Sequence, residues 1–163
     1  MKKIFAMLVV MVFAVLQLSA QQPSFNKGDK VVDLTIGVPH LYGYGMGIPP
    51  IIGSFEIGIV DGILEKAAVG VGGYVGISSS KFLGNSYFNF HFGVKGAFHY
   101  PFVDNLDTYA GIVTGYSISD LSLYGFDWGG FVGARYYVSD AFGIIAEAGY
   151  GVTFLRVGVS FKF

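Results

Sequence analysis

The sequence predicts an all-β fold, an eight-stranded antiparallel up-and-down transmembrane β-barrel. The 163 residues are 53% apolar and 17% aromatic but only 13% charged, against ~25% charged in a typical soluble domain. Beyond residue 20 no apolar run is long enough for a spanning helix, which needs about 20 residues. The apolar residues alternate instead with glycine and polar residues. Because lipid offers backbone groups no hydrogen-bond partners, a closed barrel is the remaining way to span.

Segment 1–20 predicts a cleavable secretory signal peptide. Two lysines form a positive start, the unbroken apolar run Ile4–Leu16 follows, and Ala20 marks the expected cleavage site. The alternative is a membrane anchor, which the shortness of the run disfavours. Residues 21–163 are then expected to form one domain, the barrel itself.

Eight segments in which apolar and polar side chains alternate predict the strands. In chain order they are 30–38, 51–59, 67–77, 87–100, 108–116, 126–138, 142–150 and 152–163. In the fourth, the apolar face is mostly aromatic and the opposite face carries Asn89, His91, Lys95 and His99. In the last, every second residue from Leu155 to Phe163 is apolar, and those between are polar or small.

Short turns and longer loops separate these segments in alternation. Each short turn joins Val and Asp to Gly, Asn or Ser, residues that tolerate a tight hairpin backbone. The short turns are 59–63, 102–106 and 137–141. The other connections are 39–50, 78–86, 117–125 and a short one at 150–151. Such alternation is typical of barrels that span a membrane, and it yields eight strands.

With the polar face inward, the barrel gains an interior of polar side chains separated by glycines, which an eight-stranded barrel has room to hold. The inward set is Asp33, Thr35, Ser54, Glu56, Tyr74, Asn89, His91, Lys95, His99, Tyr109, Asp127, Arg135, Glu147, Arg156, Ser160 and Lys162. Lone buried charges are costly, so these charges should pair. We expect a lumen charge network of Glu56, Lys95, Asp127, Arg135, Glu147 and Arg156, joined by Asp33 and Lys162.

One pair in this network can be predicted from local register. If the last hairpin turns between Gly151 and Val152, Glu147 lies opposite Arg156 inside the barrel. The network is interpreted as a plug that closes the lumen, with a gate or an ion path as the alternative.

The outward face is apolar, and aromatic residues recur near the strand ends as two expected girdles at the membrane interfaces. The turn-side girdle is Tyr100, Phe102, Tyr136 and Phe163. The loop-side girdle is Phe88, Tyr116 and Trp128.

These features together resemble the small eight-stranded outer-membrane proteins of the OmpA/OmpX type from Gram-negative bacteria. The resemblance covers the barrel, 21–163, and implies a porin-like protein in the lipid of the cell outer membrane. It also implies that the last strand carries an assembly signal, Val159, Phe161 and Phe163, read by the barrel-assembly machinery after delivery by periplasmic chaperones.

The sequence offers no clear catalytic or metal-binding constellation, and we expect neither enzyme activity nor a cofactor. His91 and His99 are about 27 Å apart along one strand, too far to share a metal. Ser86, Ser117, Ser119 and His40 lie in expected loops without a nucleophile motif, which leaves a lipid-modifying enzyme as a remote alternative. The net charge of −1 and the lack of any basic run exclude a nucleic-acid partner.

The leading functional interpretation is a non-enzymatic membrane barrel of structural or surface-interaction type. Loop 39–50, rich in Tyr and Gly, is the candidate contact surface for a partner. The first alternative is a narrow pore or carrier for small or apolar molecules. The second is a soluble lipocalin-like barrel with its faces inverted, which would leave Lys95, Arg135, Glu147 and Arg156 in solvent.

Overall fold

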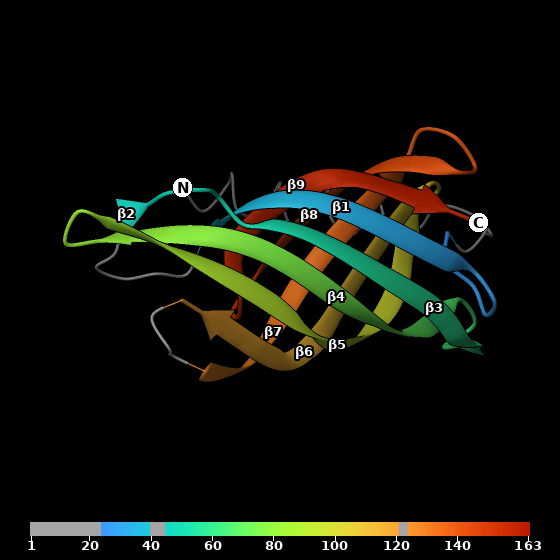
Figure 1. Ribbon diagram of the computed structural model, residues 1–163. Helices are drawn as coiled ribbons and strands as arrows, with labels where there is room; N and C mark the ends of the chain where they lie inside the picture. Colours follow the sequence, from blue (N-terminus) through green and yellow to red (C-terminus); the bar gives the residue numbers. More distant parts are fainter. Residues whose placement is uncertain (1–23, 40–44, 121–123) are drawn as a thin grey trace, which may run out of the picture.

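A closed eight-stranded antiparallel β-barrel is the architecture of this chain in a computed structural model that describes residues 24–39, 45–120 and 124–163 (Figure 1). The expected signal peptide lies outside the described residues. The long strands are β1 (Lys30–Pro39), β3 (Ile51–Ile63), β4 (Ala67–Phe82), β5 (Asn85–Val103), β6 (Leu106–Ser119), β7 (Tyr124–Tyr137), β8 (Phe142–Gly149) and β9 (Thr153–Lys162). Each pairs with the next, and β1 pairs with β9 to close the ring. The predicted fold class is therefore confirmed.

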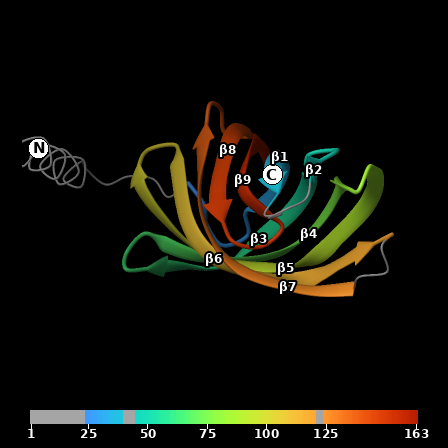
Figure 2. The ribbon, with the colours of Figure 1, turned by 90° about the vertical axis from the view of Figure 1, so that its left-hand side faces the viewer.

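The short strand β2 (Gly45–Met46) adds to this ring by pairing with β4 at the loop end. Viewed towards the loop end, the long strands surround a common interior (Figure 2). In the described part of the chain, no helix is long and apolar enough to cross a membrane.

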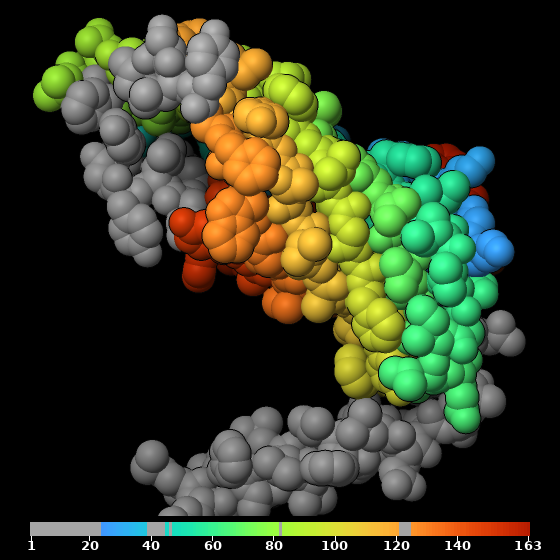
Figure 3. Space-filling view, turned by 90° about the horizontal axis from the view of Figure 1, so that it is seen from below, coloured from blue at the N-terminus to red at the C-terminus, as the bar shows by residue number. Residues whose placement is uncertain are grey.

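Side chains alternate between the interior and the outer face, with the polar residues inside. Asp33 and Glu56 are almost completely buried, whereas Leu34, Val94 and Ile112 on the outer face are 54%, 59% and 73% exposed. All sixteen side chains expected inside are buried or half-buried. A soluble barrel needs the opposite arrangement, so the lipocalin-like interpretation is wrong. Figure 3 shows one side of the apolar outer face, over β4 to β7.

Aromatic side chains on the outer face follow the two expected girdles. Six of the seven are exposed, namely Phe88, Phe102, Tyr116, Trp128, Tyr136 and Phe163. Tyr100 is half-buried instead, because it packs against Phe102 at 5.0 Å between ring centroids and beneath the Lys66 ammonium at 4.8 Å.

The first predicted turn is displaced. β3 continues through Asp61 to Ile63, and the chain reverses at Leu64–Lys66, where Leu64 and Glu65 have positive φ angles of 49° and 73°. The pairing of β3 with β4 shifts register in this stretch, so Asp61 lies in a bulged strand end. Its carboxylate accepts a hydrogen bond from the Lys27 backbone N–H at 3.1 Å. The other two turns lie where they were expected.

The predicted loop 78–86 is wrong, because β4 and β5 continue through it as an extended hairpin. Leu83 and Gly84 alone form the turn, with φ angles of 48° and 82°, as in a type I′ hairpin. The hairpin projects beyond the other strands in Figure 1. The serines at 78–80 suggested a loop, but Ser78 and Ser80 continue the inward face. The neighbouring Ser79 pairs with the segment after β2, accepting hydrogen bonds from the Gly47 and Ile48 N–H groups.

Candidate functional site: the barrel lumen

Arg135 on β7 lies at the centre of the lumen and contacts three carboxylates from three other strands. It donates to Asp33 of β1 at 2.9 and 3.2 Å, to Glu56 of β3 at 2.6 Å and to Asp107 of β6 at 3.0 Å. Its side chain has no exposed surface. An arginine can reach several acceptors at once because its guanidinium holds five N–H donors in one plane.

His99 on β5 links two of the same carboxylates. Its Nδ1 lies 2.8 Å from an Asp107 oxygen and its Nε2 lies 2.9 Å from a Glu56 oxygen. A neutral imidazole has a single N–H donor, so the imidazolium satisfies both contacts.

Lys95, four residues before His99, completes the group. Its ammonium lies 3.0 Å from Glu56 and 3.8 Å from Asp33. We refer to Asp33, Glu56, Lys95, His99, Asp107 and Arg135 as the central charge cluster. With an imidazolium at His99, its three carboxylates face three cations, which is how buried charges escape the cost of desolvation.

The segment before β1 covers the turn-side end of this cluster. Phe25 is 1% exposed and stacks on the His99 ring at 4.0 Å between centroids. Backbone hydrogen bonds tie the segment down, from the Gly28 N–H to the Gly58 carbonyl and from the Gly58 N–H to the Asp29 carbonyl. Lys162 also contacts it, donating to the Ser24 carbonyl at 3.2 Å. The pattern of polar and apolar residues had predicted no role for this segment.

The observed cluster differs from the expected network of charges. It gains His99 and Asp107, and it leaves out Asp127, Glu147, Arg156 and Lys162. Asp107 was missed because it fell between a predicted turn and a predicted strand, although it lies on the same face as Tyr109. Asp127, which we expected among the charges, lies eight residues before Arg135 on β7, about 27 Å along the strand. It does not contact Arg135 and belongs to the loop-side half of the lumen.

Glu147 and Arg156 lie opposite each other on β8 and β9, in the register that the last hairpin suggested. Arg156 donates to one Glu147 oxygen at 2.6 Å, and the Tyr109 hydroxyl donates to the other at 3.1 Å. The pair stands on the loop side of the central charge cluster, and it does not share a hydrogen bond with Arg135 in the described residues.

Nearer the loops, Asp127 joins a group of hydroxyls around His91. His91 Nε2 lies 3.0 Å from the Ser78 hydroxyl and Nδ1 lies 2.6 Å from the Ser117 hydroxyl. Ser117 in turn donates to Asp127. Ser117, expected in a loop, thus contacts His91 in the lumen. The loop residue His40 lies outside the described residues. Both ring nitrogens are engaged, so this group forms a closed hydrogen-bond chain.

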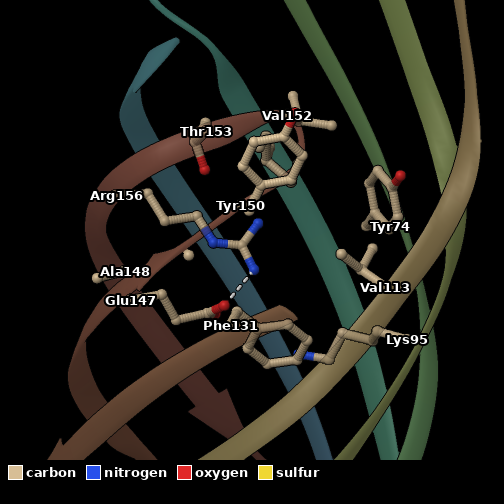
Figure 4. Close-up of a pocket in the computed structure, with 13 residues that line it drawn as sticks. Tyr74, Lys95, Val113, Phe131, Glu147, Ala148, Tyr150, Val152, Thr153 and Arg156 are labelled. Atoms are coloured by element: carbon tan, nitrogen blue, oxygen red, sulfur yellow. Dashed lines mark hydrogen bonds and ion pairs between the residues drawn. The ribbon is translucent and has the colours of Figure 1, made fainter. Parts of the chain in front are cut away.

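Between the central charge cluster and the loops lies a small, partly open cavity. Lys95, Phe131 and Glu147 border it on the cluster side, and Tyr150 and Val152 border it beside the β8–β9 loop (Figure 4). Arg156 extends from β9 into this space, with Tyr74 across from it (Figure 4). Tyr74 can lie there because Gly93 and Gly115 face it, where a Cβ atom would come within 2.7 Å of its ring or hydroxyl.

The described residues contain no cluster of three His, Cys, Asp or Glu side chains arranged to hold a metal ion. The proposed assembly residues lie at the other end of the barrel. Phe161 and Phe163 are exposed on the outer face and Val159 is half-buried. The Phe163 backbone pairs with Lys30 of β1 at 2.9 and 3.3 Å.

No protein-family model matches the sequence, and no curated protein does either. Solved structures do match the fold. OprG, an outer-membrane protein of Pseudomonas aeruginosa, has a TM-score of 0.58 at 11% identity, covering 88% of this chain and 99% of its own. The Yersinia pestis outer-membrane protein Ail, in a phospholipid nanodisc, has a TM-score of 0.56 at 10% identity, covering 84% and 100%.

A de novo designed transmembrane β-barrel matches equally well, with a TM-score of 0.54 at 16% identity over 85% of this chain and 98% of its own. All three are transmembrane barrels, and at such identities the likeness concerns the fold alone. The expected resemblance to small outer-membrane barrels is confirmed at that level: this chain has the fold of an eight-stranded transmembrane β-barrel.

Proposed function

We propose that this chain is an integral outer-membrane protein of structural or surface-interaction type whose lumen is closed by the central charge cluster. Burial of the central charge cluster is the observation that supports a closed lumen. Arg135, Glu56 and Asp107 are each 0% exposed, so a water-sized sphere does not reach them from either end. The cluster draws its side chains from β1, β3, β5, β6 and β7, which supports an obstruction across the lumen rather than along one wall.

The apolar outer face and the shared fold support the membrane location. Refolding into detergent and testing for heat-modifiable gel migration would check the barrel, and fractionation of bacterial envelopes would check the location. Recovery of the folded protein in a soluble fraction without detergent would contradict the proposal.

Closure is tested by planar-bilayer conductance of the refolded protein. The proposal predicts a silent membrane, and Arg135→Ala should produce openings because it removes the side chain at the centre of the obstruction. Lys81→Ala, at an exposed position of the projecting hairpin, should stay silent. Steady openings of the unmodified protein would refute closure.

Such openings would favour the second candidate, a narrow pore or carrier for small or apolar molecules. The cavity beside Arg156 favours this candidate, because it already opens a part of the lumen to the loop side.

A surface partner would meet the loop end of the barrel. The described part of loop 39–50 packs on the projecting hairpin through β2 and the Ile48–Ser79 hydrogen bonds, and this supports a firm surface rather than a free loop. Grafting the loop and the hairpin together onto another small barrel should transfer any adhesion to surfaces, and the loop grafted alone should transfer less. Equal transfer would contradict a joint surface.

Assembly by the barrel-assembly machinery after chaperone delivery is part of the proposal. It predicts that Phe163→Ser lowers the amount of folded protein in the outer membrane of cells but not the yield of refolding in detergent. A parallel loss in both would instead indicate a folding defect.

A further inference from the structure

The extended β4–β5 hairpin ends in a turn whose first residue is a leucine in an unfavourable backbone conformation. Leu83 has a φ angle of 48°, in the left-handed region, and Gly84 follows with a φ angle of 82°. A two-residue turn of this type favours Asn or Gly at both places, because the side chain of a leucine crowds the backbone there. Asparagine at position 83 would form the same turn with less strain, so the stability of the hairpin does not explain this leucine.

Leu83 is also 85% exposed, more than any other large apolar side chain that the structure describes. The apolar band of the outer face does not extend to it. On β4 that band ends at Ile77, and Leu83 lies six residues further on, about 20 Å along the strand. The hairpin projects beyond the other strands (Figure 1). A strained turn that presents an apolar side chain away from the barrel's own membrane indicates a contact surface.

The hairpin that carries Leu83 contains no acidic residue. Between Glu65 and Asp104 the sequence has neither Asp nor Glu. Lys81 is exposed two residues before Leu83, and it is the one charged residue in the hairpin tip, residues 81–86. The segment 45–50, which pairs with the hairpin through β2, is uncharged as well. The tip therefore combines an exposed apolar side chain with a cation, and no neighbouring acid in the hairpin opposes an anionic partner.

The turn at the opposite end of β4 provides an internal comparison. Leu64 has a similar φ angle of 49° and is 72% exposed. It is followed by Glu65 and preceded by Asp61, and both acids are exposed. Lys66, the next residue, lies over the Tyr100 ring at 4.8 Å. Two anionic side chains beside Leu64 disfavour its approach to a negatively charged surface, so the two turns carry the same apolar residue in opposite electrostatic surroundings.

A lipid surface with negative headgroups fits the hairpin tip better than a protein surface does. A specific interface between proteins buries about 800 Å² on each partner, whereas the tip of a two-stranded hairpin presents only a few side chains. A lipid surface needs no such area. An apolar side chain gains free energy by leaving water for hydrocarbon, and a lysine beside it is attracted by anionic headgroups.

We propose that the hairpin tip, with Leu83 at its apex and Lys81 beside it, docks onto a second membrane whose lipid headgroups are negatively charged. The Leu83 side chain enters the edge of the hydrocarbon, and the Lys81 ammonium meets the headgroup phosphates. A single contact of this kind is weak, but many copies in one membrane act together. The inference rests on the proposed surface-interaction role of the loop end, and it names lipid as the partner.

The test is the capture of fluorescent vesicles by proteoliposomes. The protein is refolded at many copies per vesicle into phosphatidylcholine, and heat-modifiable migration of the same sample verifies the folded barrel. Labelled probe vesicles contain phosphatidylcholine alone or mixed with an equal amount of phosphatidylglycerol. Capture of the anionic probe is expected to exceed capture of the neutral probe. Equal capture of both would overturn the anionic class. A folded barrel that captures neither would overturn lipid as the partner and favour a protein, without contradicting the proposed membrane location.

Leu83→Asn separates docking from folding, because Asn-Gly is the sequence that this turn type favours. It should lower capture of the anionic probe by at least about tenfold, the loss expected when one leucine side chain is no longer buried. Lys81→Gln should lower the same capture about fivefold. Leu64→Asn makes the matched change at the other turn and should leave capture unchanged. Undiminished capture by Leu83→Asn, or an equal loss in Leu64→Asn, would overturn the hairpin tip as the docking site.

Discussion

The two halves of the lumen use polar side chains in opposite ways. Towards the turns, the central charge cluster joins three carboxylates to three cationic side chains and is sealed by Phe25. Towards the loops, the Glu147–Arg156 pair borders a small open cavity, and the buried Tyr74 hydroxyl beside it has no partner among the described residues. Both halves are built from the same alternating strands, so the difference lies in which inward residues are long and charged.

The comparison indicates a division of roles along the barrel axis. Where opposite charges are paired and buried, removing one member leaves the others uncompensated, so that half should govern stability and closure. Where partners are missing and space is open, substitutions should have little effect on stability. Substitutions in each half of the lumen test this division.

Arg135→Met should lower the free energy of unfolding by about 3–5 kcal/mol, because it leaves three buried carboxylates without their shared cation. Urea-induced unfolding in lipid vesicles would measure the loss. Lys81→Met, an equivalent change at an exposed position, should cost less than about 0.5 kcal/mol. Similar values for both variants would remove the basis for a stabilising cluster.

Phe25→Ala should cost about 1.5–3 kcal/mol, the value of burying one large apolar side chain. It should also let water reach His99, which would speed exchange of its ring protons. Phe25→Leu is the matched variant and should retain most of the stability. If Phe25→Ala proves neutral, the segment before β1 does not seal the turn-side end.

Arg156→Gln should cost about 1.5–3 kcal/mol, as expected for a hydrogen bond between charged groups. Adding Glu147→Gln should recover part of this loss, because no uncompensated carboxylate then remains. A double-mutant cycle on unfolding free energies measures the coupling. Strict additivity of the two substitutions would contradict a direct pair.

Tyr74→Phe should change the unfolding free energy by less than about 0.5 kcal/mol, because its hydroxyl has no partner to lose among the described residues. Tyr109→Phe removes a hydroxyl that donates to Glu147 and should cost about 1 kcal/mol. The same chemical change is thus expected to lower stability where the hydroxyl has a charged partner and to leave it unchanged where the hydroxyl has none among the described residues. The reverse ranking would contradict the division.

The sequence predicted correctly those features that depend on residues close together in the chain. The strand count, the inward face and the facing positions of Glu147 and Arg156 all follow from alternation and from the register of one short hairpin. It failed where local cues were ambiguous. Asp61–Gly62 has the composition of a turn but forms a bulge, and the serines at 78–80 resemble a loop but continue a strand.

The contacts around Arg135 join residues that are far apart in the sequence, so local patterns could not predict them. Arg135 and Asp33 are 102 residues apart in sequence, and they meet because the barrel closes with a particular stagger between its strands. The alternation of polar and apolar residues predicts that both side chains point inward, but it does not predict the height of each one along the barrel axis. For the same reason the pattern could not place Asp127 away from Arg135 or bring Phe25 onto His99.

Thiol labelling from the loop side tests directly whether the central charge cluster closes the lumen, since the chain contains no cysteine. Val113→Cys borders the cavity, and Ala97→Cys lies between Lys95 and His99 at the level of the central charge cluster. The protein in lipid vesicles would be treated with a charged, membrane-impermeant thiol reagent. A closed lumen predicts that Val113→Cys is modified and that Ala97→Cys is not. Modification of both at comparable rates would show that water passes the cluster, and the closed lumen would be contradicted.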